Sequence, residues 1–119
     1  MSDTELMTLE QHLLLAIIAL HPNASGVSIQ DHIKERTARE PSTGSIYASL
    51  DRLEEKGFIK SRQGEPIKER GGKRKLYFTI TAPGQQTLRQ SLRAIHSLSH
   101  GLCWKGIAVL PSAVSTINF

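Results

Sequence analysis

The stretch from Ser42 to Ile80, STGSIYASLDRLEEKGFIKSRQGEPIKERGGKRKLYFTI, decides the fold of this chain. Its first part places Ile46, Leu50 and Leu53 at helical spacing, so it predicts a short helix with one apolar face. Lys60–Lys75 then holds seven Lys and Arg against two Glu, a formal charge of +5 in a chain whose net charge is +4. An alternating pattern typical of a strand follows. A short helix followed by a cationic hairpin is the arrangement with which a winged helix holds duplex DNA.

Helical patterns flank this stretch on both sides. Two precede it, one with Thr8 as the expected N-cap and one with Ser28 as the expected N-cap. Strands are expected over residues 58–62 and 73–81, and Thr81 then caps a fourth helix. The order helix, helix, helix, strand, strand, helix predicts a mainly α fold with a small β hairpin. We expect a winged helix-turn-helix domain over residues 1–81, a C-terminal dimerisation helix over residues 82–110, and a tail over residues 111–119.

Composition limits the classes of protein to which the chain can belong. Its 119 residues fit one domain, and a sequence pI of about 9.5 favours a polyanionic partner. The single cysteine, Cys103, excludes an internal disulfide and fits a reducing cytoplasm. The N-terminus is acidic and polar, unlike a signal peptide, and the apolar run over residues 13–20 is too short to cross a bilayer. We expect a cytoplasmic protein that has no membrane partner.

The candidate DNA-contacting residues lie on the third helix and on the hairpin, which forms the wing. Small residues at the N-terminal end of the helix allow a close approach to the groove floor, and hydroxyl groups can bind phosphates or base edges. The expected contacts are Ser42, Thr43, Ser45, Tyr47, Ala48, Ser49 and Arg52 on the helix, and Lys73, Arg74 and Lys75 on the wing.

Each of these assignments has a simpler alternative. Tyr47 lies at the border of the apolar face and could be a packed core tyrosine. Arg52 could form a solvated ion pair with Glu55 or Asp51 instead of contacting a phosphate. A run of three cations is often only a solubilising surface, and strand geometry prevents all three from facing one row of phosphates. The hairpin context and the local concentration of charge favour DNA binding.

Three blocks of the sequence resemble the PadR family of bacterial transcriptional regulators. They are TLEQHLLLAIIAL (Thr8–Leu20), PSTGSIYASLDRLEEKGFI (Pro41–Ile59) and GGKRKLYFTITAPGQQTL (Gly71–Leu88). The resemblance implies a bacterial, nucleoid-associated homodimer: a winged-helix repressor of a near-palindromic operator, with a C-terminal helix that forms the dimer. It places Tyr47 on the family's DNA-reading helix and residues 73–75 on its wing cations. It also implies that small aromatic effectors act near the dimer interface. The region after Leu98 departs from the family pattern.

Two further groups of residues suggest ligands. His96, His100 and Cys103 recur at helical spacing near one face, and imidazole with thiolate suits Zn²⁺, so a metal-responsive repressor is an alternative. The ordinary alternative for these residues is a surface or interface face. Trp104 could stack on an aromatic effector, although a lone tryptophan on an apolar stripe more often packs in an interface.

Enzymes and protein-interaction modules are the remaining classes. Gly71-Gly72 lacks the strand–loop–helix setting of a phosphate-binding loop, and no nucleophile motif is present. We therefore expect no enzymatic activity and no cofactor. A winged helix that binds protein instead of DNA is the stronger alternative, and the salt dependence of DNA affinity discriminates between the two.

Overall fold

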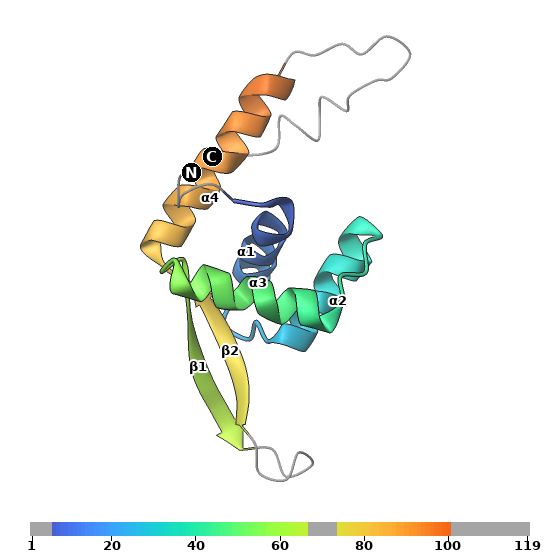
Figure 1. Cartoon of the computed structure of the whole chain (residues 1–119), viewed down its shortest axis with the longest axis vertical. Coiled ribbons are helices and arrows are strands. Elements are labelled where there is room, and N and C mark those ends of the chain that lie inside the picture. Colours follow the sequence, from blue (N-terminus) through green and yellow to red (C-terminus); the bar gives the residue numbers. More distant parts are fainter. Residues whose placement is uncertain (1–5, 67–73, 101–119) are drawn as a thin grey trace.

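The computed structural model describes residues 6–66 and 74–100, with only the backbone of Pro66 and Arg74. The elements are α1 (Thr8–Leu20), α2 (Gly26–Thr37), α3 (Thr43–Glu55), β1 (Ile59–Pro66), β2 (Arg74–Ile80) and α4 (Ala82–Ser99). In Figure 1 the first three helices form the body, the hairpin extends from one end of it, and α4 leaves toward the other end. The predicted fold class, mainly α with a small β hairpin and a C-terminal helix, is confirmed.

The predicted start of α2 was wrong. Its N-cap is Ser25, and Ser28 is its partner. The Ser28 Oγ accepts the Ser25 N–H at 2.8 Å, while the Ser25 Oγ accepts the Ser28 N–H at 3.3 Å. The two serines thus satisfy each other's amides, so the helix begins three residues earlier than the sequence suggested. The N-cap of α1 is Met7 instead of Thr8, because the Glu10 carboxylate accepts the Met7 N–H at 2.9 Å.

The predicted ends of α3 are confirmed. The Ser42 Oγ accepts the Ser45 N–H at 3.1 Å and caps the start. Gly57 follows the last turn with φ +80°, a conformation that only glycine adopts at little cost.

A single residue, Thr81, joins β2 to α4, and both its side chain and its backbone N–H form hydrogen bonds. Its Oγ1 donates to the Gly57 carbonyl at 2.6 Å and accepts the Gly84 N–H at 3.1 Å, so the predicted cap is confirmed. Its backbone N–H donates to the Phe58 carbonyl at 3.0 Å. Gly84 packs so closely on the same carbonyl that a methyl group there would collide with it. The junction therefore fixes the start of α4 against the base of the hairpin.

The hairpin is longer than predicted on its first strand. β1 pairs antiparallel with β2 from Ile59 opposite Ile80 through Gln63 opposite Leu76, and it continues to Pro66 opposite Arg74 after an irregularity in register. The prediction ended β1 at Arg62, because the polar residues beyond it lack strand alternation. These residues extend beyond the core, where pairing requires no apolar face.

The core lies where α1, α2 and α3 meet the base of the hairpin. The side chains that are almost fully buried include Leu13, Leu14, Ile17, Ile29, Ile46, Leu50 and Leu53. Phe58 and Phe78 extend this core into the hairpin, and the Phe78 N–H donates to the Ala24 carbonyl at 2.7 Å. The body therefore supports both α3 and the wing. Among the described residues, no helix has the length and apolar character needed to cross a membrane.

Candidate nucleic-acid interface

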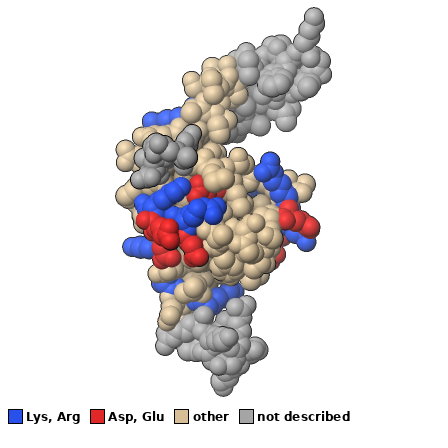
Figure 2. All heavy atoms as spheres, in the orientation of Figure 1, with Lys and Arg blue, Asp and Glu red and all other residues tan. Residues whose placement is uncertain are grey.

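The N-terminal half of α3 presents a small, uncharged surface. Ser42, Thr43, Gly44, Ser45 and Ala48 are all exposed. In Figure 2 the centre of this face, over the N-terminal half of α3, carries neither Lys and Arg nor Asp and Glu, while charged groups lie on both sides of it. A surface of this kind can approach the floor of a groove without a bulky side chain in the way.

Ser49 does not belong to that surface, which corrects the prediction that it is exposed. Only 1% of it is accessible, because it lies three residues after Ile46 and four before Leu53, on the face that packs against the body. Its Oγ accepts a hydrogen bond from Arg52 Nη2 at 2.9 Å. Ser49 therefore holds Arg52 in place. Its side chain is small because it packs against the body, and not because it approaches DNA.

Tyr47 is neither a packed core residue nor a fully exposed side chain. It is 41% exposed, yet its ring packs directly on Gly26, the first residue of α2. A methyl group at Gly26 would collide with the Tyr47 hydroxyl and would lie 2.5 Å from Cζ. The ring is therefore fixed on one side and available to a ligand on the other.

The C-terminal half of α3 is acidic on its surface. Asp51, Glu54 and Glu55 are exposed there, and the Glu54 carboxylate accepts a hydrogen bond from the Ser61 hydroxyl of β1 at 3.0 Å. A polyanion is repelled by these carboxylates. The two halves of α3 thus differ in electrostatics, and a DNA backbone suits only the first half.

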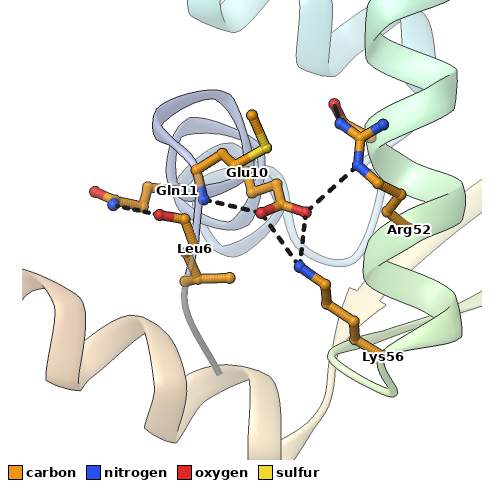
Figure 3. Close-up of polar contacts among 7 residues, drawn as sticks. Leu6, Glu10, Gln11, Arg52 and Lys56 are labelled. Carbon is orange, nitrogen blue, oxygen red and sulfur yellow. Dashed lines mark hydrogen bonds and ion pairs between the residues drawn. The ribbon is translucent and has the colours of Figure 1, made fainter. Parts of the chain in front are cut away.

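Arg52 pairs with neither of the acids that the sequence offered as partners. Its Nε lies 3.8 Å from Glu10 Oε2, and Lys56 Nζ lies 3.2 Å from the same oxygen. The Glu10 side chain is 0% exposed, whereas Arg52 and Lys56 remain 47% and 26% exposed. Figure 3 shows the three side chains converging from α1 and from the end of α3. Helical periodicity gave no signal for Glu10, because a carboxylate is not expected at a buried position.

We predict that Glu10→Ala lowers the free energy of unfolding by about 2–3 kcal/mol, because it leaves two cations and the Met7 amide without their shared acceptor. Urea denaturation of the mutant and the wild type measures the change. Glu55→Ala is the matched control: Glu55 is exposed, so its loss should change stability by no more than about 0.5 kcal/mol. Equal stability of the Glu10 mutant and the wild type would show that the cluster contributes nothing to folding.

The turn between α2 and α3 is held by polar contacts beside the predicted DNA contacts. Gln30 Nε2 donates to the Pro41 carbonyl at 2.9 Å, and Lys34 Nζ lies 3.0 Å from Glu40 Oε1. The hydrogen bond to Glu40, and then its negative charge, raise the pKa of Lys34 above its usual value. The pair is exposed, so it orients the turn more than it stabilises the fold.

The wing carries an arginine that the sequence analysis missed. Arg62 Nη2 donates to the Pro22 carbonyl at 3.0 Å, and its guanidinium carbon lies 4.7 Å from the centre of the Tyr77 ring. Lys75 Nζ approaches the same ring at 6.0 Å. Of the other predicted wing cations, Lys73 lies outside the described residues and Arg74 is placed on β2 by its backbone alone. Only the strand register, which the sequence does not reveal, brings Arg62 to Tyr77.

α4 leaves an apolar stripe uncovered. Leu88 is buried against the body, but Ile95 and Leu98 are 52% and 79% exposed. Leu15 and Ile18 of α1 are also exposed, and they line an open pocket of about 480 Å³ together with Leu92 and Arg89 of α4. A monomer therefore exposes apolar surface on two adjacent helices.

The residues considered for metal and effector binding fall at the end of the described chain. The rings of His96 and His100 lie 5.4 Å apart between centres. Cys103 and Trp104 lie outside the described residues. Within residues 6–66 and 74–100, no three His, Cys, Asp or Glu side chains form a group that could hold a metal ion.

Comparisons with known proteins agree on one family. The model of the transcriptional regulator PadR-like family matches residues 14–90. A transcriptional regulator from Clostridium thermocellum is 25% identical, with a TM-score of 0.65 over 76% of this chain and 85% of that chain. A PadR family transcription regulator from Clostridium difficile is 26% identical, with a TM-score of 0.57 over 75% and 93% of the two chains. A putative transcriptional regulator from Thermoplasma acidophilum, 22% identical, shares the fold with a TM-score of 0.59 over 92% and 97%. No curated protein sequence matches the chain.

Proposed function

The chain belongs to the PadR-like family of transcriptional regulators, and from this membership we propose that it is a homodimeric repressor of an operator in double-stranded DNA. α3 enters the major groove with its N-terminal half, and the wing contacts the flanking phosphates. The observation that carries this proposal is the contrast along α3, whose first half is small and uncharged while its second half is acidic. Only the first half can lie against a polyanion.

The proposed contacts follow from that orientation. Ser42, Thr43, Ser45, Tyr47 and Ala48 face the groove, and Lys73, Arg74 and Lys75 bind phosphates from the wing. Arg52 is engaged by Glu10 and Ser49, so we propose that it holds α3 in place and contributes to DNA binding indirectly. Arg62 sets the angle of the wing through its bond to the Pro22 carbonyl.

The apolar stripe of α4 supports the homodimer. A second copy that covers Ile95 and Leu98 would remove two large exposed side chains from water, which favours association by the hydrophobic effect. Two subunits related by a twofold axis would then read a near-palindromic operator with half-sites about one helical turn apart, or a multiple of it.

The pocket between α1 and α4 adjoins the same stripe, so it supports release by a small aromatic effector that Trp104 helps to bind. Quenching of the fluorescence of Trp104, the only tryptophan, by candidate aromatic compounds tests this part of the proposal. No change in fluorescence with any compound that releases the DNA would exclude Trp104 from the effector site.

Salt dependence of DNA binding tests the function itself. Two of the three wing cations on each subunit can face one row of phosphates, so a dimer would displace counterions from about four phosphates. The logarithm of the binding constant should then fall with the logarithm of salt with a slope of about −4. Titration of genomic duplex fragments at several salt concentrations measures the slope. A winged helix that binds protein would show neither this slope nor a preference among fragments.

A further inference from the structure

We propose that Gly26 is a positioning residue for Tyr47, and that the glycine thereby sets where the tyrosine hydroxyl meets a phosphate oxygen of the DNA. The inference rests on the proposed function and deepens it. Gly26 is the first residue of α2 and Tyr47 lies in the second turn of α3. The pair therefore joins the two helices of the helix-turn-helix on the side that we assign to DNA.

Space, and not backbone conformation, requires the glycine. The one described glycine with positive φ is Gly57, so the backbone of Gly26 is open to any residue. What excludes a side chain is the tyrosine: a methyl group at Gly26 would collide with the hydroxyl and would lie 2.5 Å from Cζ and 3.0 Å from Cε1. Glycine at a position whose backbone suits alanine lowers stability, because it adds conformational entropy to the unfolded chain, so its presence here needs a reason of this kind.

The surface beneath the ring is held firmly. Gly26 is buried, and the reciprocal hydrogen bonds between Ser25 and Ser28 fix the backbone on both sides of it. The Ile29 N–H also donates to the Ser25 carbonyl at 2.8 Å. Tyr47 is 41% exposed, so its ring has a fixed support on one side and a free side toward a ligand. This support restricts the ring to one placement, which lowers the entropy that DNA binding must remove.

The collision involves the far end of an exposed side chain, so its consequences are local. Alanine at position 26 would push the ring of Tyr47 away, while the buried residues of the core stay in place. The hydroxyl would then no longer lie at the phosphate. A hydrogen bond to a charged group contributes enough that its loss weakens binding at least about tenfold.

A double-mutant cycle on the full chain tests the inference. The four proteins are the wild type, Gly26→Ala, Tyr47→Ala and the double mutant, and the probe is a duplex that the wild type selects from a random pool. We expect each single mutant to bind at least about tenfold more weakly, and the double mutant to bind no more weakly than Tyr47→Ala. Normal binding by Gly26→Ala, or a further loss in the double mutant, would overturn the positioning role.

Thermal melting supplies a second readout that a purely structural role would not produce. In the Tyr47→Ala background, Gly26→Ala should raise or preserve the melting temperature, because alanine favours the helix and nothing opposes it. Gly44→Ala is the control, since nothing lies within 4 Å of a methyl group there. A drop in melting temperature caused by Gly26→Ala in the absence of the tyrosine would mean that the glycine serves the fold and not Tyr47.

The design separates the inference from the function on which it depends. A wild type that selects no duplex overturns the proposed function, and the inference falls with it. A wild type that selects a duplex, together with a Tyr47→Ala mutant that binds it equally well, overturns the inference alone.

Discussion

Replacing Lys73 and Arg74 together with glutamate should abolish specific operator binding and leave the fold and the homodimer intact. Each replacement changes the charge by two, so the net charge of a subunit falls from +4 to 0. In a dimer four phosphate contacts become repulsive, and we expect affinity to fall by about a thousandfold or more at moderate salt, with a shallower salt slope. Fluorescence anisotropy of a labelled operator at several salt concentrations measures both effects.

The control makes the same change of charge elsewhere. Arg36 and Arg39 are exposed at and just after the C-terminal end of α2, which is the end away from the hairpin in Figure 1, and neither forms an ion pair with another described residue. Their double replacement with glutamate lowers the net charge equally but should reduce affinity far less, because contacts with phosphate depend on distance. Equal losses in the two mutants would mean that overall charge, and not the wing, governs binding. An unchanged affinity of the wing mutant would contradict its proposed role outright.

Ile46→Asp should prevent folding altogether. Ile46 is 1% exposed, at the contact of α3 with the body, and no ion pair among the described residues brings a cation to that position. Burial of an unpaired carboxylate, with loss of the isoleucine packing, costs about 5 kcal/mol or more, which equals much of the stability of a small domain. Circular dichroism should show no cooperative unfolding transition.

Two mutants define the scale of that effect. Ile46→Val removes one methylene and should cost about 1 kcal/mol while the transition remains cooperative. Val27→Asp introduces the same carboxylate at a position that is 47% exposed, where stability should change by no more than about 0.5 kcal/mol. A cooperative, near-normal transition in Ile46→Asp would show that α3 is not anchored through this residue.

The sequence was sufficient to predict every element, because each depends on local rules. Apolar spacing marks the helices, and Ser42, Gly57 and Thr81 mark their ends. The error at Ser28 also has a local origin, since a reciprocal pair of serines looks the same from either member. The sequence did not predict the interactions between segments that lie far apart along the chain.

The candidate functional surface likewise combines features that follow from local sequence with contacts between distant segments. Exposure of residues 43–45 and of Ala48 followed from helical periodicity, which left Tyr47 at the border of the apolar face. The same periodicity, applied to Ser49, gives the buried position that the prediction missed. The partners of Arg52 and Arg62 lie 42 and 40 residues away along the chain, at Glu10 and Pro22. No local pattern encodes such a pairing, because it depends on how the helices and the hairpin pack.

The junction at Thr81 has a mechanical consequence. With hydrogen bonds to the carbonyls of Gly57 and Phe58, and with Gly84 against the latter, α4 and the base of the hairpin have no hinge between them. In the proposed homodimer, a tilt of one α4 relative to the other would therefore be transmitted to the wing as a rigid-body rotation. We expect a ligand between the subunits to alter the separation of the wings without melting any secondary structure.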